Sequence, residues 1–163
     1  VVGIPILVKL YLSGSAADFA LAEAFIGLGM LVGTATVYRI GNRYPHGLLF
    51  LVGLFIDGAS FCFYYFVENL NQLNLLSFLH GIGIPFLIIS RVSIMQKNIP
   101  EKLLGRVFAI ISISILSMTA VSSGIIGSLA EFLDIRTIFL LFGILAGLCG
   151  VAGLLHPKIR FLN

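Results

Sequence analysis

Long apolar stretches, separated by short polar breaks, constrain this sequence more than any other feature. One short run covers residues 1–12, and five longer runs cover 19–38, 47–67, 73–95, 107–129 and 137–155. A helix that crosses the ~30 Å hydrocarbon core of a bilayer needs about 20 mostly apolar residues. Strands of a transmembrane β-barrel would instead alternate polar and apolar residues. The sequence therefore predicts an all-α integral membrane protein with five complete transmembrane helices and a truncated one at residues 1–12.

Composition supports the same class. Hydrophobic residues make up 59% of the 163 residues and charged residues 10%, whereas soluble domains are about 25% charged. A soluble fold would expose much of this apolar surface, so the lipid bilayer is the expected partner. The net charge is only +3, and the basic residues form no stripe, so we expect no nucleic acid as a partner.

Cysteine and histidine positions argue against an enzyme. Cys62 and Cys149 lie inside apolar runs without the spacing of metal ligands, so we expect no metal, no cofactor and no structural disulfide. An intramembrane enzyme would need several such groups at one depth. His46 and His156 fall at one surface and His80 in the opposite half, so no cluster is predicted.

Charged residues predict the orientation. Because successive loops alternate sides, the breaks at 39–46 and 96–106 and the tail share one face. With the nearby helix end, this face carries eight of the ten Lys and Arg residues: Arg39, Arg43, Arg91, Lys97, Lys102, Arg106, Lys158 and Arg160. The positive-inside rule makes this face cytoplasmic. We therefore expect a multi-pass protein of the cell (inner or plasma) membrane with a cytoplasmic carboxyl terminus, and Tyr64 among the tyrosines at the outer interface.

The break before the fifth run carries a motif. Residues 96–108 read Gln-Lys-Asn-Ile-Pro-Glu-Lys-Leu-Leu-Gly-Arg-Val-Phe, with Pro100, Gly105 and Arg106 at the fixed positions. This resembles the Q-R-x-x-P-x-x-x-x-G-R-V-F signature of the major facilitator superfamily, in the branch with macrolide efflux proteins and the enterobactin exporter. Residues 22–29, together with Gly33, resemble the eighth helix of that branch. The resemblance covers the whole chain and aligns it with helices seven to twelve.

A second loop motif departs from the family pattern. The superfamily's G-x-x-x-D-R-x-G-R motif aligns with residues 39–46, which begin at Arg39 and keep Arg43. The family's Asp is Asn42 here, and its second Gly is Pro45. In the family this loop latches one state through charged contacts. Asn42 can hydrogen-bond but forms no ion pair, which weakens the expected latch.

The resemblance implies secondary active export of a lipophilic or amphipathic small molecule, coupled to protons. Residues 1–163 would form the carboxyl-terminal half of a twelve-helix bundle, and the missing amino-terminal half would be a partner. The first run is short and no initiating Met precedes it, so we expect a fragment. A lysolipid or siderophore transporter of the same fold, and a non-transporting remnant, remain alternatives.

Two acidic residues inside the apolar runs are candidates for proton coupling, because an ionisable group at membrane depth is costly. Asp57 lies mid-run, where desolvation favours a protonated carboxyl that loads and unloads near neutral pH. Alternatively, it bonds a neighbouring helix. The resemblance places its helix, the ninth, peripheral to the substrate cavity. Glu23 lies near the outer end of the eighth helix, which lines the cavity in the family, or it extends to the interface.

The fourth run carries further candidates. His80 and Arg91 fall on nearly one helical face and are candidates for a proton or substrate path, although His80 can simply bond another helix and Arg91 can reach lipid phosphates. Gly81, Gly83 and Pro85 are the hinge candidates, because Pro85 removes one backbone donor and glycines permit bending.

Small residues spaced four apart predict close helix contacts. These pairs are Gly29/Gly33, Ser123/Gly127, Gly124/Ser128 and Gly143/Gly147. The hydroxyls of the fifth run, among them Ser114 and Thr119, either line a cavity or bond the preceding turn.

The orientation gives a testable prediction. A reporter fused within residues 97–102 should be active only on the cytoplasmic side, because this turn is basic. An exported reporter at that position, active on the outer side of the membrane, would overturn the membrane topology.

Overall fold

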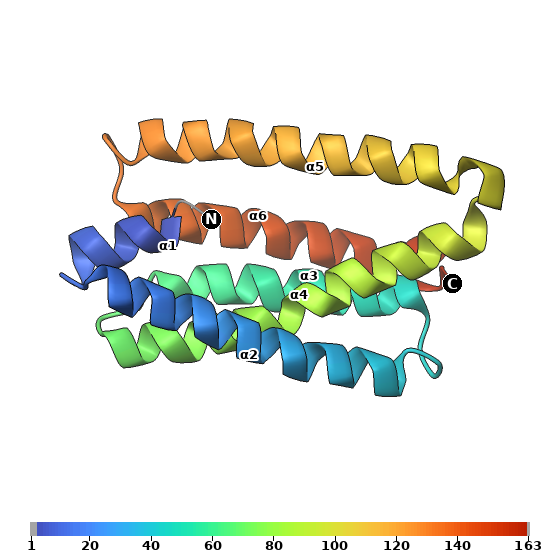
Figure 1. Cartoon of the computed structure of the whole chain (residues 1–163), viewed down its shortest axis with the longest axis horizontal. Coiled ribbons are helices and arrows are strands. Elements are labelled where there is room, and N and C mark those ends of the chain that lie inside the picture. Colours follow the sequence, from blue (N-terminus) through green and yellow to red (C-terminus); the bar gives the residue numbers. More distant parts are fainter. Residues whose placement is uncertain (1–2, 163) are drawn as a thin grey trace.

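The computed structural model describes residues 3–162, which form helices that run back and forth along one axis (Figure 1). In chain order the elements are α1 (Gly3–Ile6), the π-helix η1 (Leu7–Tyr11), α2 (Ala16–Ile40), α3 (His46–Tyr64), α4 (Leu70–Asn98), α5 (Glu101–Leu129), α6 (Ile135–Leu155) and α7 (Pro157–Arg160). Helices α2 to α6 are long and apolar enough to cross a membrane. The predicted all-α membrane fold is confirmed, and the short first run is helical over its described part, residues 3–11.

Polar residues in the breaks between the apolar runs cap the amino-terminal ends of several helices. At α2, the Ser15 hydroxyl accepts a bond from the backbone N–H of Asp18, whose carboxylate accepts one from the backbone N–H of Ser15 at 2.7 Å. The side chain of Asn69 caps α4, and that of Asp134 caps α6 by accepting from Arg136 N–H at 2.9 Å. These caps satisfy backbone donors that the first turn of a helix leaves without partners.

The break at 96–106 is shorter than the sequence analysis predicts. Helix α4 continues to Asn98, and α5 begins at Glu101, so only Ile99 and Pro100 separate the two helices. Ile99 is extended, as expected for the residue before a proline, and Pro100 is the N-cap of α5. Gly105 and Arg106 therefore lie on α5 and not in a loop, which corrects the loop assignment for these two residues.

The other loop motif keeps its predicted place. Arg39 lies in the last turn of α2, and Asn42 and Arg43 lie in the turn that joins α2 to α3. Neither Asn42 nor Arg43 takes part in an ion pair within the described residues. The charged latch of the family motif is thus not formed by this loop within residues 3–162.

Glycines bring α2 and α4 into close contact. A Cβ atom at Gly29 would meet the carbonyl oxygen of Phe78, one at Gly33 the carbonyl oxygen of Ile82, and one at Gly81 that of Ile26. Backbones this close leave no room for a side chain, and such contacts drive helix association in membranes. The predicted Gly29/Gly33 contact is therefore confirmed.

The same device joins α3 to its two neighbours. A Cβ at Gly53 would lie 2.7 Å from Cβ of Phe86 on α4, and one at Gly83 would lie 2.9 Å from Ile56 on α3. On the other side of α3, a Cβ at Gly143 of α6 would lie 2.6 Å from the backbone nitrogen of Cys62. Helix α3 thus lies between α4 and α6, and the predicted packing of Gly143 is confirmed.

Helix α5 makes no such close contacts with the other described helices. None of its residues is buried, and Figure 1 shows it apart from the other long helices. A Cβ at Gly124 or Gly127 would meet no atom within 4 Å, so the predicted close contacts on this helix are not formed within residues 3–162. The hydroxyls of Ser114 and Thr119 donate to carbonyls of the preceding turn at 2.8 Å.

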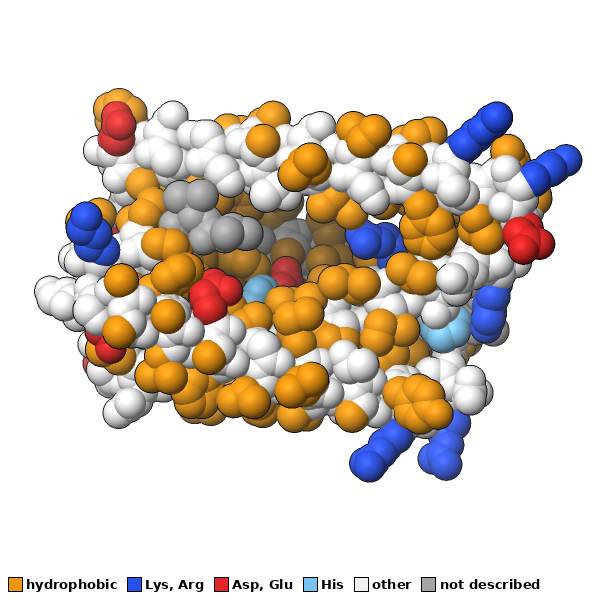
Figure 2. All heavy atoms as spheres, in the orientation of Figure 1, with side chains coloured by type: hydrophobic (Ala, Val, Ile, Leu, Met, Phe, Trp, Pro, Cys, Tyr) orange, Lys and Arg blue, Asp and Glu red, His pale blue; other side chains and the backbone are white. Residues whose placement is uncertain are grey.

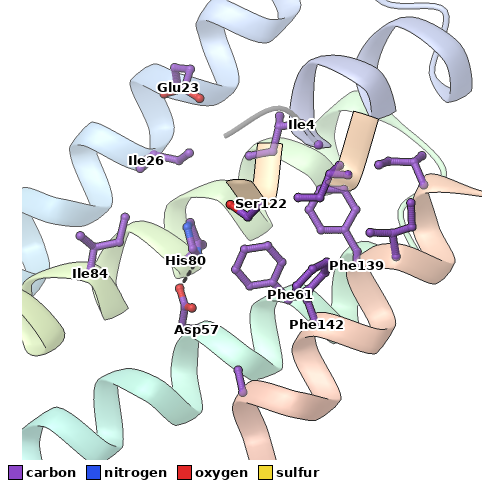
Figure 3. A pocket seen from close by; sticks show the side chains of 15 residues that line it. Ile4, Glu23, Ile26, Asp57, Phe61, His80, Ile84, Ser122, Phe139 and Phe142 are labelled. Atoms are coloured by element: carbon purple, nitrogen blue, oxygen red, sulfur yellow. Dashed lines mark ion pairs between the residues drawn. The ribbon is translucent and has the colours of Figure 1, made fainter. Parts of the chain in front are cut away.

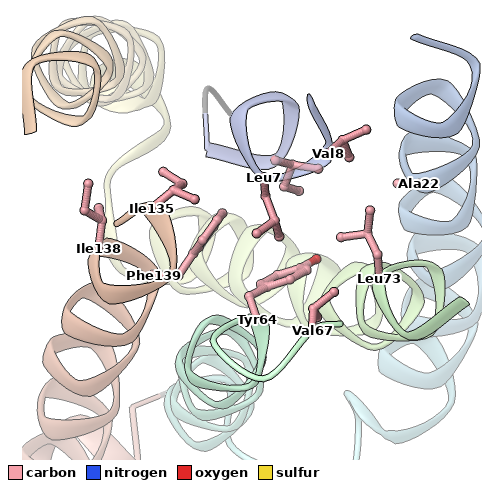
Figure 4. Close-up of a cluster of buried hydrophobic side chains, with 10 residues drawn as sticks. Leu7, Val8, Ala22, Tyr64, Val67, Leu73, Ile135, Ile138 and Phe139 are labelled. Atoms are coloured by element: carbon pink, nitrogen blue, oxygen red, sulfur yellow. The ribbon is translucent and has the colours of Figure 1, made fainter. Parts of the chain in front are cut away.

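A buried cluster forms near the end of the bundle that carries the α3–α4 turn (Figure 4). Leu7 of η1, Leu73 of α4 and Phe139 of α6 surround Tyr64 of α3, which has no exposed surface. The Tyr64 hydroxyl lies 3.3 Å from the Ser77 hydroxyl, which satisfies it in the interior. Tyr64 is therefore a core residue near this end of the bundle and does not face lipid in this structure, whereas its depth near the outer interface stays a prediction.

Charge separates the two ends of the bundle. The α2–α3 turn, the α4–α5 turn and the chain's C-terminal end lie at the same end, where Figure 2 shows most of the Lys and Arg side chains. Most acidic side chains lie towards the opposite end or in between. The predicted clustering of basic residues at one end is confirmed as a feature of the fold.

The close contact of Gly29 with α4 can be tested by substitution, with the open position Gly127 as a matched control. Gly29→Ala should lower the melting temperature of the detergent-solubilised protein, because overpacking a tight interface costs about 1–3 kcal/mol. Gly127→Ala should leave it unchanged or raise it, because Ala is about 1 kcal/mol better than Gly in a helix and this site is open. Equal melting temperatures for the two variants would contradict this packing.

Candidate functional site

A cavity of about 440 Å³ opens between the helices and is lined by residues from all five long helices and α1. Figure 2 shows the hollow, with red and pale-blue side chains inside it. Its walls are mostly apolar, with aromatic rings from Phe61, Phe139 and Phe142 (Figure 3). The polar side chains that line it are Glu23, Asp57, His80 and Ser122. Volume and lining are those of a small-molecule site.

An ion pair joins two helices inside this cavity. Nδ1 of His80 on α4 lies 3.0 Å from Oδ1 of Asp57 on α3 (dashed line in Figure 3). The side chains are 14% and 21% exposed, respectively, so both are largely desolvated yet reachable from the cavity. The ring nitrogen has no aligned hydrogen-bond partner within the described residues, so the contact is electrostatic more than directional. The pair is an ion pair only while the imidazole carries a proton.

Aromatic rings fix the orientation of the imidazole. The Phe61 ring meets the His80 ring edge-on at a centroid distance of 5.3 Å, and the Tyr64 ring does so at 6.5 Å. Tyr64 is held in turn by its contact with Ser77, one turn before His80 on α4. Gly81, which follows His80, is the residue at which the backbone of α4 lies against the backbone of α2. The position of His80 is therefore set from three sides.

Glu23 reaches the cavity from α2. Its side chain is exposed and has no ion-pair partner within residues 3–162. Figure 3 places it across the cavity from the Asp57–His80 pair. Two carboxylates and one imidazole therefore face the same space from three helices.

The structure brings some of the predicted site residues together and leaves others apart. The resemblance places Asp57 peripheral to the substrate cavity, whereas here it lines the described cavity beside His80. Arg91 is half-buried on α4 and does not line this cavity, so no His80–Arg91 path is assembled in it. The pairing of Asp57 with His80 was missed because helical periodicity relates residues only within one helix.

The hinge candidates lie inside an unbroken helix. Gly81, Gly83 and Pro85 are buried, and α4 passes through Pro85 without ending. Figure 1 shows α4 changing direction along its length. A proline removes one hydrogen bond of the helix and is a known cause of such bends.

Arg136 secures the start of the described chain beside the cavity. Its guanidinium lies 3.5 Å from the centroid of the Tyr11 ring and donates a bond to the carbonyl of Val67 at 2.7 Å. The Tyr11 hydroxyl donates to the Asp134 carboxylate at 3.2 Å. These contacts hold η1, and with it Ile4 in the cavity wall, against α6. In the sequence, the feature that could have indicated this role is the position of Arg136 among the acidic residues at that end of the bundle.

The side chains that line the cavity suit the binding of a small molecule. No group of three or more His, Cys, Asp or Glu residues within the described chain is arranged to hold a metal ion. Apolar and aromatic walls suit an amphipathic molecule, while the carboxylates and imidazole can hold charge or protons.

Comparisons with known proteins show which family and which relative this chain resembles. A family model described as Major Facilitator Superfamily matches residues 1–160. A protein of Lactococcus lactis subsp. lactis (strain IL1403), the "Multi-drug resistance efflux pump PmrA homolog", is 31% identical over 84 residues. That alignment covers 52% of this chain and 21% of the relative, so the matched region spans about a fifth of the relative's length.

Proposed function

This chain belongs to the Major Facilitator Superfamily, a family of multi-pass membrane transporters, and we propose that it exports a lipophilic or amphipathic small molecule in exchange for protons. The observation that carries the proposal is the cavity itself. Its walls are apolar and aromatic, and Glu23, Asp57 and His80 face it from three membrane-spanning helices. Similarity to a protein described as a multi-drug resistance efflux pump supports the outward direction and the drug-like substrate.

We also propose that the chain is the carboxyl-terminal half of a twelve-helix transporter in the macrolide-efflux and enterobactin-exporter branch. Support comes from the motif around Pro100, Gly105 and Arg106, and from five spanning helices preceded by a short helical segment. The partners would be the amino-terminal half, the lipid bilayer and the transported molecule. Substrate sites at the interface between two repeats are typical of such transporters.

The basic end of the bundle supports a place in the cell membrane with the carboxyl terminus in the cytoplasm. The tail helix α7, which carries Lys158 and Arg160, lies at the same end of the bundle as the α4–α5 turn, which is flanked by Lys97 and Lys102 (Figure 1). Their charge would be attracted to anionic lipids of the cytoplasmic leaflet.

Proton coupling is assigned to Glu23 and Asp57, because both carboxylates line the cavity from membrane-spanning helices, and an ionisable residue within a membrane span is typical of a proton path. In the complete transporter, Glu23→Gln and Asp57→Asn should each reach the membrane but lose most drug-evoked proton movement. The measurement is the loss of protons from the acidic lumen of everted vesicles on drug addition, followed with a lumenal pH indicator, with membrane amount checked by immunoblot. Glu101→Gln, at the basic end and away from the cavity, is the matched control. Unchanged coupling in both cavity variants would remove the proposed proton role.

Pro85 is proposed as the bending point of α4 during transport. Pro85→Ala should restore a straight helical bond pattern and slow the transport rate more than it weakens ligand binding. Initial transport rate and equilibrium binding of the same drug, measured on one preparation, separate the two effects. If binding and rate fall in equal proportion, the hinge role is excluded.

A further inference from the structure

We propose that the seam between α3, α6 and the tail helix α7 binds an anionic phospholipid of the surrounding bilayer. The lipid phosphate would lie at Lys158 and Arg160 of α7, and one acyl chain would fill an apolar groove between α3 and α6. This groove shares no lining residue with the central cavity. The proposal therefore stands independently of the transported molecule and of proton coupling.

The groove has a volume of about 270 Å³ and is lined by residues of α3 and α6 alone. A Cβ atom at Gly58 of α3 would lie 2.8 Å from the backbone nitrogen of Gly147 of α6, so the two backbones are in close contact at this point. Small residues at such a crossing leave a slot where larger side chains would otherwise lie. The small residues that line the groove are Gly58, Ala59, Cys62, Gly143 and Gly147.

Large apolar side chains form the rim of the groove. Phe55 of α3 and Leu148 and Val151 of α6 line it and are exposed. Because α3 and α6 are both long and apolar enough to span a membrane, the acyl chains of the bilayer surround this surface. An unfilled gap would forfeit the dispersion contacts of its lining. A slot with a small-residue floor between bulky rims fits a slender acyl chain, whereas the side chains of a whole helix would meet the rims.

Two cations lie just beyond the basic end of the groove. Val151 is the last groove residue of α6, and the helix ends at Leu155, about 6 Å further along its axis. The tail helix α7 follows after one residue and carries Lys158 and Arg160. Its position suits the headgroup of a lipid whose acyl chain enters the groove from this end.

The tail helix lies over the same seam as the groove. The backbone N–H of Gly47, at the start of α3, donates to the carbonyl of Leu162 at 2.8 Å, and a Cβ at Gly47 would meet the carbonyl oxygen of Ile159. Spacings of three and four residues place Gly47 on one face of α3 with the groove residues. That face contains Gly47, Leu51, Phe55, Gly58 and Cys62.

The charge at this end is available to a ligand. Neither Lys158 nor Arg160 takes part in an ion pair within residues 3–162. Nε of Arg160 is buried and has no hydrogen-bond partner among these residues, whereas Lys158 is exposed. Guanidinium groups bind phosphate oxygens through paired N–H bonds, and an ammonium adds a point charge. Basic pockets beside spanning helices are typical sites for anionic lipid headgroups.

A second copy of the chain is the competing occupant, because glycines spaced four apart can also pair helices. A two-fold symmetric contact uses the same surface on both copies. Within one membrane it would bring two copies of α7, and thus their Lys158 and Arg160 side chains, to the same end of the contact. The charge of the tail therefore favours an anionic lipid over a second copy.

The test uses phosphatidylglycerol as the anionic probe and phosphatidylcholine with the same acyl chains as the probe without net charge. Each is titrated into the complete detergent-solubilised transporter, and bound lipid is counted by native mass spectrometry. Wild type should bind phosphatidylglycerol roughly tenfold more tightly, because each nearby cation favours an anionic headgroup. Phosphatidylglycerol with six-carbon chains should bind more weakly than the long-chain lipid, because short chains fill less of the groove.

Substitutions separate the headgroup from the acyl chain. Lys158→Gln should weaken phosphatidylglycerol binding roughly fivefold. Lys102→Gln is its matched control: the same exchange at the same end, on α5, which lies apart from α3 and α6, should leave binding unchanged (Figure 1).

Gly147→Leu should fill the groove and weaken phosphatidylglycerol binding. The substitution needs no repacking, because a Cβ at Gly147 meets no atom within 4 Å. Ala152→Leu, at an exposed position of α6 outside the groove, is the matched control and should bind like wild type. Gel filtration checks folding, and the comparison of chain lengths on wild type tests the groove even where Gly147→Leu fails to fold.

Four results would overturn the proposal. Equal affinities for the two lipids would exclude a headgroup site at the tail. Equal losses in Lys158→Gln and Lys102→Gln would reduce the effect to general attraction by the basic end. Unchanged binding in Gly147→Leu would leave the groove without an acyl chain. A dimer that Gly147→Leu converts to a monomer would assign the groove to a second copy. The export proposal is tested separately, by the vesicle assay on Glu23 and Asp57.

Discussion

Close contact between helix backbones at glycine positions determines the rest of this structure. Lipid tails are as apolar as the side chains that face them, so burial of apolar surface drives membrane helices together only weakly. Helix α4 instead meets α2 at Gly81 and α3 at Gly83, where any side chain would collide with a neighbouring backbone or side chain. These contacts leave little freedom for α4 to slide or rotate. His80 precedes Gly81 directly, so its distance from α3 follows from this packing.

The same packing brings Asp57 and His80 together. Asp57 lies between Gly53 and Gly58, the residues at which α3 meets α4 and α6. A carboxylate fixed at that position must find a partner, because a lone charge in a low-dielectric interior is strongly unfavourable. His80 provides it at 3.0 Å, and the cavity keeps both groups reachable. The glycine contacts of α3 and α4 therefore determine both how these helices pack and where Asp57 and His80 lie in the cavity.

The sequence predicted the helices well because each one is encoded locally, by an apolar run between capping residues such as Ser15 and Asn69. It predicted that Gly29, Gly33 and Gly143 pack closely, because close contact requires small residues, but it predicted none of the contacts at Gly53 and Gly58 of α3. It did not predict the Asp57–His80 pair, since residues on different helices are related only through tertiary packing. The burial of Tyr64 was not predicted for the same reason, since only tertiary packing brings Ser77 beside its hydroxyl in the interior.

Helix α5 shows why small residues alone do not define a contact. Its Gly124 and Gly127 have the same spacing logic as Gly29 and Gly33, yet no atom lies within 4 Å of a Cβ built at either. Ser114 and Thr119 donate to carbonyls of their own helix, so their hydroxyls need no neighbour. The Ser122 hydroxyl also donates within the helix, to the carbonyl of Thr119 at 3.1 Å. Because none of its residues is buried, packing within residues 3–162 constrains α5 less than α4, which has close glycine contacts on two sides. The cavity wall at α5 is therefore the least constrained by packing, whereas the wall that carries Asp57 and His80 is held by the glycine contacts of α3 and α4.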